Sequence, residues 1–146
     1  VEPTEPNITA LLPGAPLKWA DLVTPGTAVP TAWEKKGFDE MDLAYQKVRE
    51  ELNQKIATRM RAGAPADEVA RLKDDAERLS KEHALKVDAY LAKSAFVGKV
   101  GAFEGAGYAS SGLYRSSLDC LMFSKGAKPF CKACERAVAR VVEHYL

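Results

Sequence analysis

The sequence is poor in histidine, in net charge and in long apolar runs. Its two histidines, His83 and His144, are far apart in the chain. A catalytic zinc ion generally takes three protein ligands and a water molecule, so these two residues cannot build such a site by themselves. The net charge of +1 lacks the basic footprint of a nucleic-acid-binding domain. No apolar run approaches the roughly 20 residues that span a bilayer. We therefore expect neither a nucleic-acid partner nor a membrane span.

Cysteine is also scarce, and Cys120, Cys131 and Cys134 all fall in one late segment. An odd number leaves one thiol unpaired or paired outside the chain. The C-x-x-C pair is weak evidence for zinc, because Cys120 supplies only one further ligand. His144 would lie about 15 Å along a helix from Cys134, too far for one tetrahedral site.

Three interpretations of the cysteines follow. A disulfide from Cys120 to Cys131 or Cys134 ranks first, because it would tie a turn to the last helix and suits an exported enzyme. Buried thiols rank second and structural zinc third. A thioredoxin-like redox role ranks last, because no βαβ pattern surrounds the cysteines.

The chain divides into three sections, the first of which is residues 1–37. It holds most of the prolines and few periodic apolar positions, which predicts an extended strip lying over another part of the protein. Residues 17–23 are predicted to form a short helix or strand. The expected anchors of the strip are large apolar residues: Trp19, Leu22, Val23 and Trp33.

Residues 38–94 are charged and rich in alanine, with apolar residues at alternating spacings of three and four. Gly63 and Pro65 interrupt the pattern and suit the end of one helix and the start of another. Two amphipathic helices joined by so short a turn predict an antiparallel hairpin. The two expected inner stripes are Met41, Tyr45, Val48, Leu52, Ile56 and Met60, then Val69, Leu72, Ala76, Leu79, His83, Val87 and Tyr90.

Residues 95–146 combine glycines, aromatic residues and all the cysteines. Residues 95–100 are predicted to form a short strand, and the glycines that follow favour loops and short extended pieces over a regular helix. Residues 129–146 predict an amphipathic helix beneath the preceding turn. Its expected inward residues are Phe130, Cys134, Ala137, Val138, Val141 and Tyr145. Together the three sections predict a mostly helical α+β fold.

Several stretches resemble the bacterial IgA-peptidase-like zinc metalloendopeptidases. They are GAFEGAGYASSGLYRSSLDCLMFS and PFCKACERAV near the end, and EPNITA and KWADLVTPGT near the start. The resemblance implies the C-terminal subdomain of a metzincin-like catalytic domain, with the hairpin as an insertion. It also implies a zinc ion held by an H-E-x-x-H helix whose glutamate is the general base. The sequence contains no such motif, so the resemblance implies that the motif and the zinc ligands lie upstream of residue 1.

The resemblance also implies roles for residues of this chain. Met122 would lie in a methionine-containing turn, as an apolar pedestal beneath the zinc ligands. The partners would be a protein or peptide substrate and the upstream half of the same catalytic domain, in a secreted or periplasmic bacterial enzyme. The expected substrate-binding residues are Glu104, Gly105, Tyr108, Phe123 and Ser124.

Two other functions remain open from the sequence. The chain could be a non-catalytic module that binds a protein through the helical hairpin. It could also be a structural domain stabilised by a disulfide or by cysteine-bound zinc.

Overall fold

The computed structural model describes residues 1–106, 109–123 and 128–146, with only the backbone at Ser110. The chain divides into two compact units. The hairpin comprises Lys36–Ala92, and the mixed unit comprises Val1–Lys35 together with Lys93–Leu146. The described elements are three α-helices, a short 3₁₀ helix and a small three-stranded sheet, so the mostly helical α+β fold class is confirmed.

The hairpin consists of α1 (Lys35–Arg61) and α2 (Ala66–Ala92). Gly63, at φ 71°, occupies the left-handed position that ends α1. Its N–H donates to the carbonyl of Met60 at 3.2 Å, and the N–H of Ala64 donates to the carbonyl of Arg59 at 3.0 Å. This is a Schellman motif, in which glycine avoids the steric penalty of the left-handed conformation. The first helix therefore ends at Gly63, as the sequence predicts.

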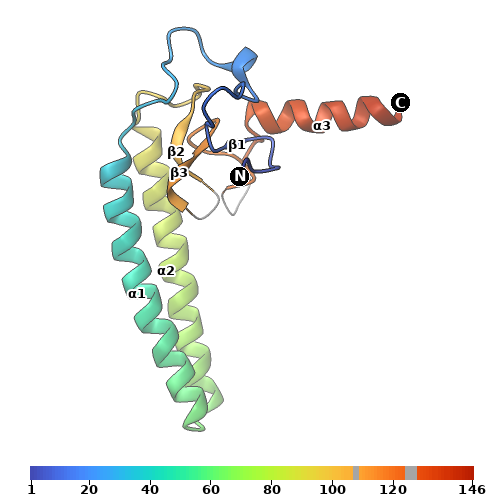
Figure 1. Cartoon of the computed structure of the whole chain (residues 1–146). Coiled ribbons are helices and arrows are strands. Elements are labelled where there is room, and N and C mark those ends of the chain that lie inside the picture. The colour runs from blue at the N-terminus through green and yellow to red at the C-terminus, as the bar shows by residue number, and fades with distance from the viewer. Residues whose placement is uncertain (107–108, 124–127) are drawn as a thin grey trace. The chain divides into compact units, whose positions relative to one another are not determined.

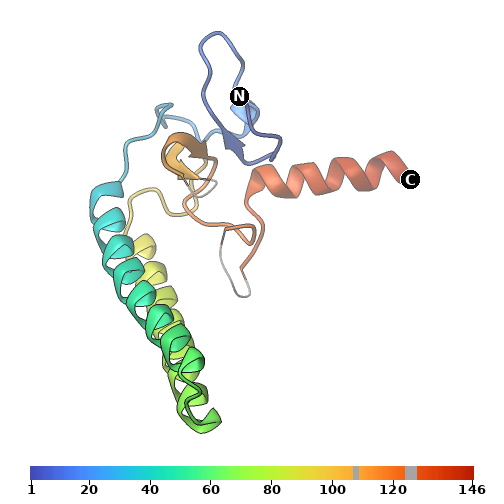
Figure 2. The same cartoon turned by 60° about the horizontal axis from the view of Figure 1, so that its bottom comes forward.

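α1 and α2 lie side by side in both cartoon views (Figures 1 and 2). As the residue number rises in α1, the number of its partner in α2 falls, so the helices are antiparallel. The cross-helix contacts run from the open end to the turn: Phe38 with Tyr90, Tyr45 with His83, and Arg59 with Glu68.

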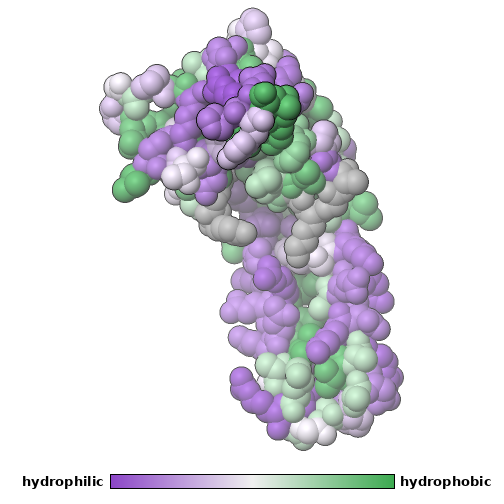
Figure 3. Space-filling model, turned by 90° about the vertical axis from the view of Figure 1, so that its right-hand side faces the viewer, coloured by the Kyte–Doolittle hydropathy of each residue, from purple (hydrophilic) through white to green (hydrophobic). Residues whose placement is uncertain are grey.

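The expected inner stripe of α2 is half-buried throughout, but that of α1 is not. Val48 and Met60 are 49% and 54% exposed, which corrects their predicted inward position. Two helices pack along one narrow seam, so positions beside the seam stay in solvent when no third element covers them. Figure 3 shows hydrophobic side chains between hydrophilic margins near the tip of the hairpin.

The sheet of the mixed unit has the order β1–β3–β2 and is antiparallel. Its strands are β1 (Ile8–Thr9), β2 (Phe103–Ala106) and β3 (Ala109–Arg115). Arg115 pairs with Ile8 on one side and with Phe103 on the other. The N-terminal strip therefore does more than lie over the domain, because it contributes an outer strand to this sheet.

Two local predictions in this unit need correction or refinement. Residues 95–100 do not form a strand: the chain turns at residues 95–98. Gly98 has φ 73° there, and the N–H of Lys99 donates to the carbonyl of Phe96 at 3.1 Å. The left-handed glycine reverses the chain where apolar composition alone suggested extension. In the expected 17–23 element, only the 3₁₀ helix η1 (Ala20–Leu22) forms.

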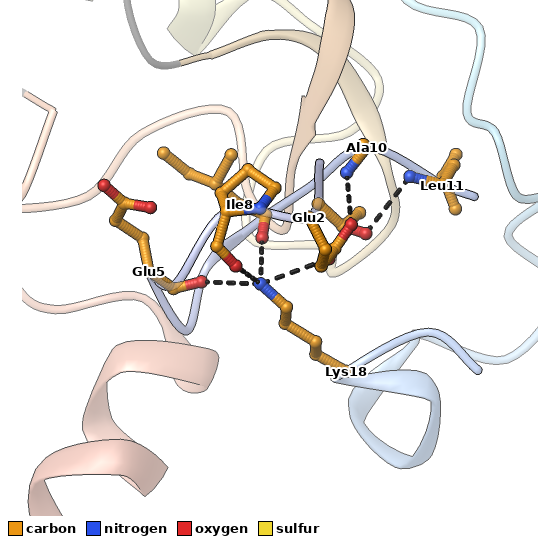
Figure 4. Close-up of polar contacts among 8 residues, drawn as sticks. Glu2, Glu5, Ile8, Ala10, Leu11 and Lys18 are labelled. Atoms are coloured by element: carbon orange, nitrogen blue, oxygen red, sulfur yellow. Dashed lines mark hydrogen bonds and ion pairs between the residues drawn. The ribbon is translucent and has the colours of Figure 1, made fainter. Parts of the chain in front are cut away.

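Lys18 holds the N-terminal loop in place (Figure 4). Its ammonium donates to the backbone carbonyls of Pro3, of Glu5 at 3.1 Å and of Ile8 at 2.7 Å. It also forms an ion pair with Glu2 at 3.1 Å. An ammonium has three donor hydrogens, so these contacts satisfy it fully and fix the turn before β1.

Trp19 is the largest side chain in the core of the mixed unit and is fully buried. Its indole N–H donates to the carbonyl of Gly101 at 2.6 Å. A Cβ atom on Gly101 would lie 2.4 Å from Oγ1 of Thr31, so only glycine fits at this crossing. Val100, Ala133 and the three cysteines complete the core cluster.

The last helix, α3 (Lys132–Tyr145), starts later and is less buried than predicted. Cys131 is its N-cap, with extended backbone at φ −66° and ψ 163°. Ala133 and Cys134 are buried, but the apolar residues further along are not. In Figures 1 and 2 no other described helix or strand of this unit lies alongside α3. The predicted inward residues that are exposed instead are Phe130, Val138, Val141 and Tyr145.

Candidate functional site

Strand β2 contains the first expected substrate-binding residues. Glu104 lies opposite Tyr114 in the β2–β3 register, and the Tyr114 hydroxyl donates to its carboxylate at 3.4 Å. The indole N–H of Trp33 donates to the Glu104 backbone carbonyl at 3.2 Å. Both the side chain and the backbone of Glu104 are therefore held in place, with the carboxylate half-buried.

Gly105 interrupts the pairing of β2 with β3. The register shifts between Glu104 and Ala106, and Gly105 has φ 104°. Such a bulge re-aims neighbouring side chains and favours glycine at the position with positive φ. Two other expected substrate-binding residues, Tyr108 and Ser124, lie outside the described residues.

Arg115, at the end of β3, lies between two aromatic rings. Its guanidinium carbon is 5.1 Å from the centroid of Trp33 and 5.6 Å from that of Phe123. Guanidinium groups at these distances are attracted to the ring faces. Phe123, expected to bind substrate, is half-buried, and in this structure it packs against Arg115 and the core cluster. The contact between Arg115 and Trp33 was not predictable from the sequence, because the two residues are far apart in the chain.

Met122 lies in a turn that several hydrogen bonds define. The Asp119 carboxylate accepts the N–H of Cys120 at 2.9 Å, and the Cys120 carbonyl accepts the N–H of Phe123 at 2.9 Å. Asp119 also forms an ion pair with Lys128 at 2.5 Å. The Met122 side chain is 64% exposed. The turn thus presents an apolar thioether on a backbone that is fixed from several sides.

The three cysteines converge beside this turn. Cys120, Cys131 and Cys134 are free and buried, and their Sγ atoms all lie within 4.8 Å of one another. The backbone N–H groups of Cys131 and Met122 donate to Sγ of Cys120 at 3.2 Å and 3.5 Å. The Ser116 hydroxyl lies 3.5 Å from Sγ of Cys131 and donates to it. Within the described residues, this is the one group of three potential metal ligands.

The three thiols have different acidities. Burial raises the pKa of Cys120 and, more strongly, that of Cys134. Burial also acts to raise the pKa of Cys131, but hydrogen bonds from Ser116, from the Cys134 backbone and from the neighbouring thiols outweigh it. The pKa of Cys131 is therefore lowered, so negative charge in the cluster concentrates on this sulfur.

The histidines do not fit a catalytic zinc site. His83 lies in the hairpin, where its ring stacks on Tyr45 at 3.8 Å and its Nε2 lies 3.2 Å from Asp42. His144 lies in the last turn of α3 and packs edge-on against Tyr145 at 5.1 Å. Each histidine belongs to a different unit, and each is engaged with its own neighbours. Neither histidine therefore has the other beside it to share a metal ion.

The sequence model of a family described as IgA peptidase M64 matches residues 1–142. No curated protein and no solved structure matches. Among the helices of the described ranges, none is long and apolar enough to cross a membrane.

Proposed function

The chain belongs to the IgA peptidase M64 family, and we propose that it forms the C-terminal part of a zinc-dependent metalloendopeptidase domain. Membership of the family places the chain in a peptidase domain, which acts on a protein or peptide substrate. The parent protein is proposed to be a secreted or periplasmic bacterial enzyme. The match over residues 1–142 is the observation that carries this proposal.

The proposed division of labour follows from the residues present. The H-E-x-x-H motif would lie upstream of residue 1 and hold the zinc ion, which activates the water that attacks the peptide bond. This chain would line the substrate cleft and support the zinc site in a metzincin-like arrangement. The separate positions of His83 and His144 support this division, because neither has a second histidine beside it to share a metal ion.

Met122 is proposed to be the apolar pedestal beneath the zinc ligands. Its exposure leaves the thioether available to the upstream half of the domain. The hydrogen bonds around Cys120 hold the backbone of the turn that carries it. A polarizable thioether fills the space below imidazole ligands without offering a competing charge. The turn thereby supplies shape to the zinc site and no ligand.

The substrate cleft is proposed to be lined by residues of β2, by Tyr108 and by the segment after Met122. Glu104 supports this role, because its carboxylate is oriented by Tyr114 and would accept hydrogen bonds from a bound peptide. Gly105 would allow the peptide backbone to approach closely. The residues proposed to line the cleft are Glu104, Gly105, Tyr108, Phe123 and Ser124.

The test uses the natural gene product with its upstream region. Met122→Lys is expected to lower both zinc content and peptide hydrolysis by at least tenfold, because it places a cation beneath the metal. Met122→Leu keeps an apolar side chain and is expected to retain most of both. Leu121→Lys is the matched control, since Leu121 is the exposed neighbour in the same turn. Unchanged zinc content and turnover in Met122→Lys would contradict the pedestal.

A second candidate function is a protein-binding module that uses the hairpin. Its support is the set of exposed apolar side chains on the two helices, including Leu43, Met60 and Leu85. Deleting residues 41–90 from the longer protein should then abolish partner binding, while the deletion variant still cleaves a short peptide. Loss of cleavage together with binding would assign the hairpin to the catalytic domain instead.

A further inference from the structure

The three cysteines come from two places that the fold brings together. Cys120 ends the segment after β3, whereas Cys131 caps α3 and Cys134 lies in its first turn. Residues three apart at the start of a helix lie on the same face. Cys131 and Cys134 therefore present their sulfurs to Cys120 together, and all three sulfurs lie within 4.8 Å of one another.

This separation suits one metal ion at the centre of the triangle. A zinc–thiolate bond of about 2.3 Å in a tetrahedral site places its sulfurs about 3.8 Å apart. The observed sulfurs would need to move by at most about 1 Å to reach that spacing, which small side-chain rotations provide. A disulfide would join only two of the sulfurs. It would leave the third, which lies within 4.8 Å of both, as a free thiol.

The surroundings of the cluster stabilise negative charge on sulfur. Cys120 accepts two backbone N–H groups, and Cys131 accepts the Ser116 hydroxyl. Cys131 also lies at the N-terminus of α3, where the helix dipole is positive. Hydrogen bonds of this kind orient thiolate ligands and tune the metal in known sites. The cluster thus has the donors around its sulfurs that a buried metal–thiolate centre requires.

We propose that Cys120, Cys131 and Cys134 form a three-thiolate site for a single soft, thiophilic metal ion, with Zn²⁺ as the ion that the ligand set favours. Binding releases the thiol protons to solvent, and the fourth coordination position is filled by a group other than these three cysteines. The ion would tie the turn that carries Met122 to the first turn of α3. The site is independent of the proposed catalytic zinc, because its ligands are cysteines of this chain.

The test titrates the reduced, metal-free chain with Co²⁺ and then with Zn²⁺. We expect one equivalent of Co²⁺ to bind with thiolate-to-cobalt charge-transfer bands, and Zn²⁺ to displace it. Bound metal should protect all three thiols from alkylation in the unmodified protein, a readout that needs no variant. Cys120→Ser, Cys131→Ser and Cys134→Ser should each weaken binding by at least tenfold, and Ser116→Ala by roughly tenfold. Ser94→Ala, which removes a hydroxyl bonded to Glu34, is the matched control and should change nothing.

Two results would overturn the proposal. The first is metal uptake that the three serine substitutions leave unchanged. The second is a protein two hydrogens lighter as isolated, with one alkylatable thiol, that binds no Co²⁺ after reduction; the cysteines would then form the disulfide that the sequence favoured. Neither result affects the pedestal test, because Met122→Lys is read out in the longer protein at the H-E-x-x-H site.

Discussion

The hairpin and the mixed unit are built from contacts of different range. In the hairpin, the contacts between elements join two successive helices along one seam, as with Tyr45 and His83. In the mixed unit, the Trp19 indole bonds to Gly101 across 82 residues of sequence. Local periodicity therefore specifies the hairpin, whereas the mixed unit needs its distant segments to meet before its core exists. The candidate sites lie in the mixed unit, where substitutions in the core should have the larger effects.

The largest expected effect comes from Trp19→Ala. Trp19 is fully buried and is the largest side chain of the core, so its loss should cost about 3–5 kcal/mol in the free energy of unfolding. Hydrogen exchange should show the loss in the amides of β1 and β3, while those of α1 and α2 keep most of their protection. Equal loss of protection in the hairpin would break the contrast between the two units.

Gly101→Ala should cost about 2–3 kcal/mol, measured by urea unfolding. The added Cβ would lie 2.4 Å from Oγ1 of Thr31, a side chain fixed by its bonds to the Ala28 carbonyl and the Ala102 N–H. Gly37→Ala is the matched control in the hairpin. Its Cβ would lie 2.5 Å from the Tyr90 hydroxyl, the far end of a side chain that can rotate away.

The Gly37→Ala change should therefore be nearly neutral, because alanine also favours the helix by about 1 kcal/mol. A large loss in Gly37→Ala with little loss in Gly101→Ala would reverse the expected order. Such a result would show that the hairpin seam is the more tightly packed of the two places.

Lys18→Met should have a smaller and more local effect, of about 1–2 kcal/mol. It retains much of the aliphatic stem but removes the donors to the carbonyls of Glu5 and Ile8, leaving these acceptors without their cation. Limited proteolysis should show faster cleavage before β1, with the pairing of β2 and β3 intact by hydrogen exchange. An unchanged cleavage rate would show that the strand pairing alone holds the N-terminal loop.

The smallest expected effect is at the tip of the hairpin. The side-chain hydrogen bond from Arg59 holds the pKa of Glu68 below its ordinary value, against the opposing effect of burial. This contribution is present above the ordinary pKa of glutamate and is lost as the pH falls through the lowered value. Glu68→Gln should therefore lower the unfolding temperature slightly at neutral pH and not at acid pH. A difference of equal size at both would remove the ion pair as the cause.

The sequence predicted more of the hairpin than of the candidate site. Alternating spacings and the Gly63 signal predicted the two helices and the end of the first, because each depends on neighbours within a few residues. The glycine-rich stretch was expected to hold short extended pieces, but its register with β1 was not predictable. The strand predicted at residues 95–100 was wrong, because Gly98 turns the chain there.

The amphipathic pattern of α3 predicted a helix and misplaced its covered face. Val138 and Val141 lie on the apolar side, yet both are exposed. A pattern shows which side of a helix would be buried if something covers it, and only the packed structure shows whether anything does. The contact of Arg115 with Trp33 and Phe123 could likewise not be predicted from the sequence, because no local pattern relates those positions.

The sequence by itself determined the helices, the Gly63 turn that ends the first of them and the family to which the chain belongs. These depend on residue types at fixed spacings, which act through short-range sterics and hydrogen bonding. Only the tertiary structure decided that Trp19 lies against Gly101 and that the three cysteines converge on one point. Such meetings depend on which distant segments bury their apolar surface together, and a linear pattern does not carry that information.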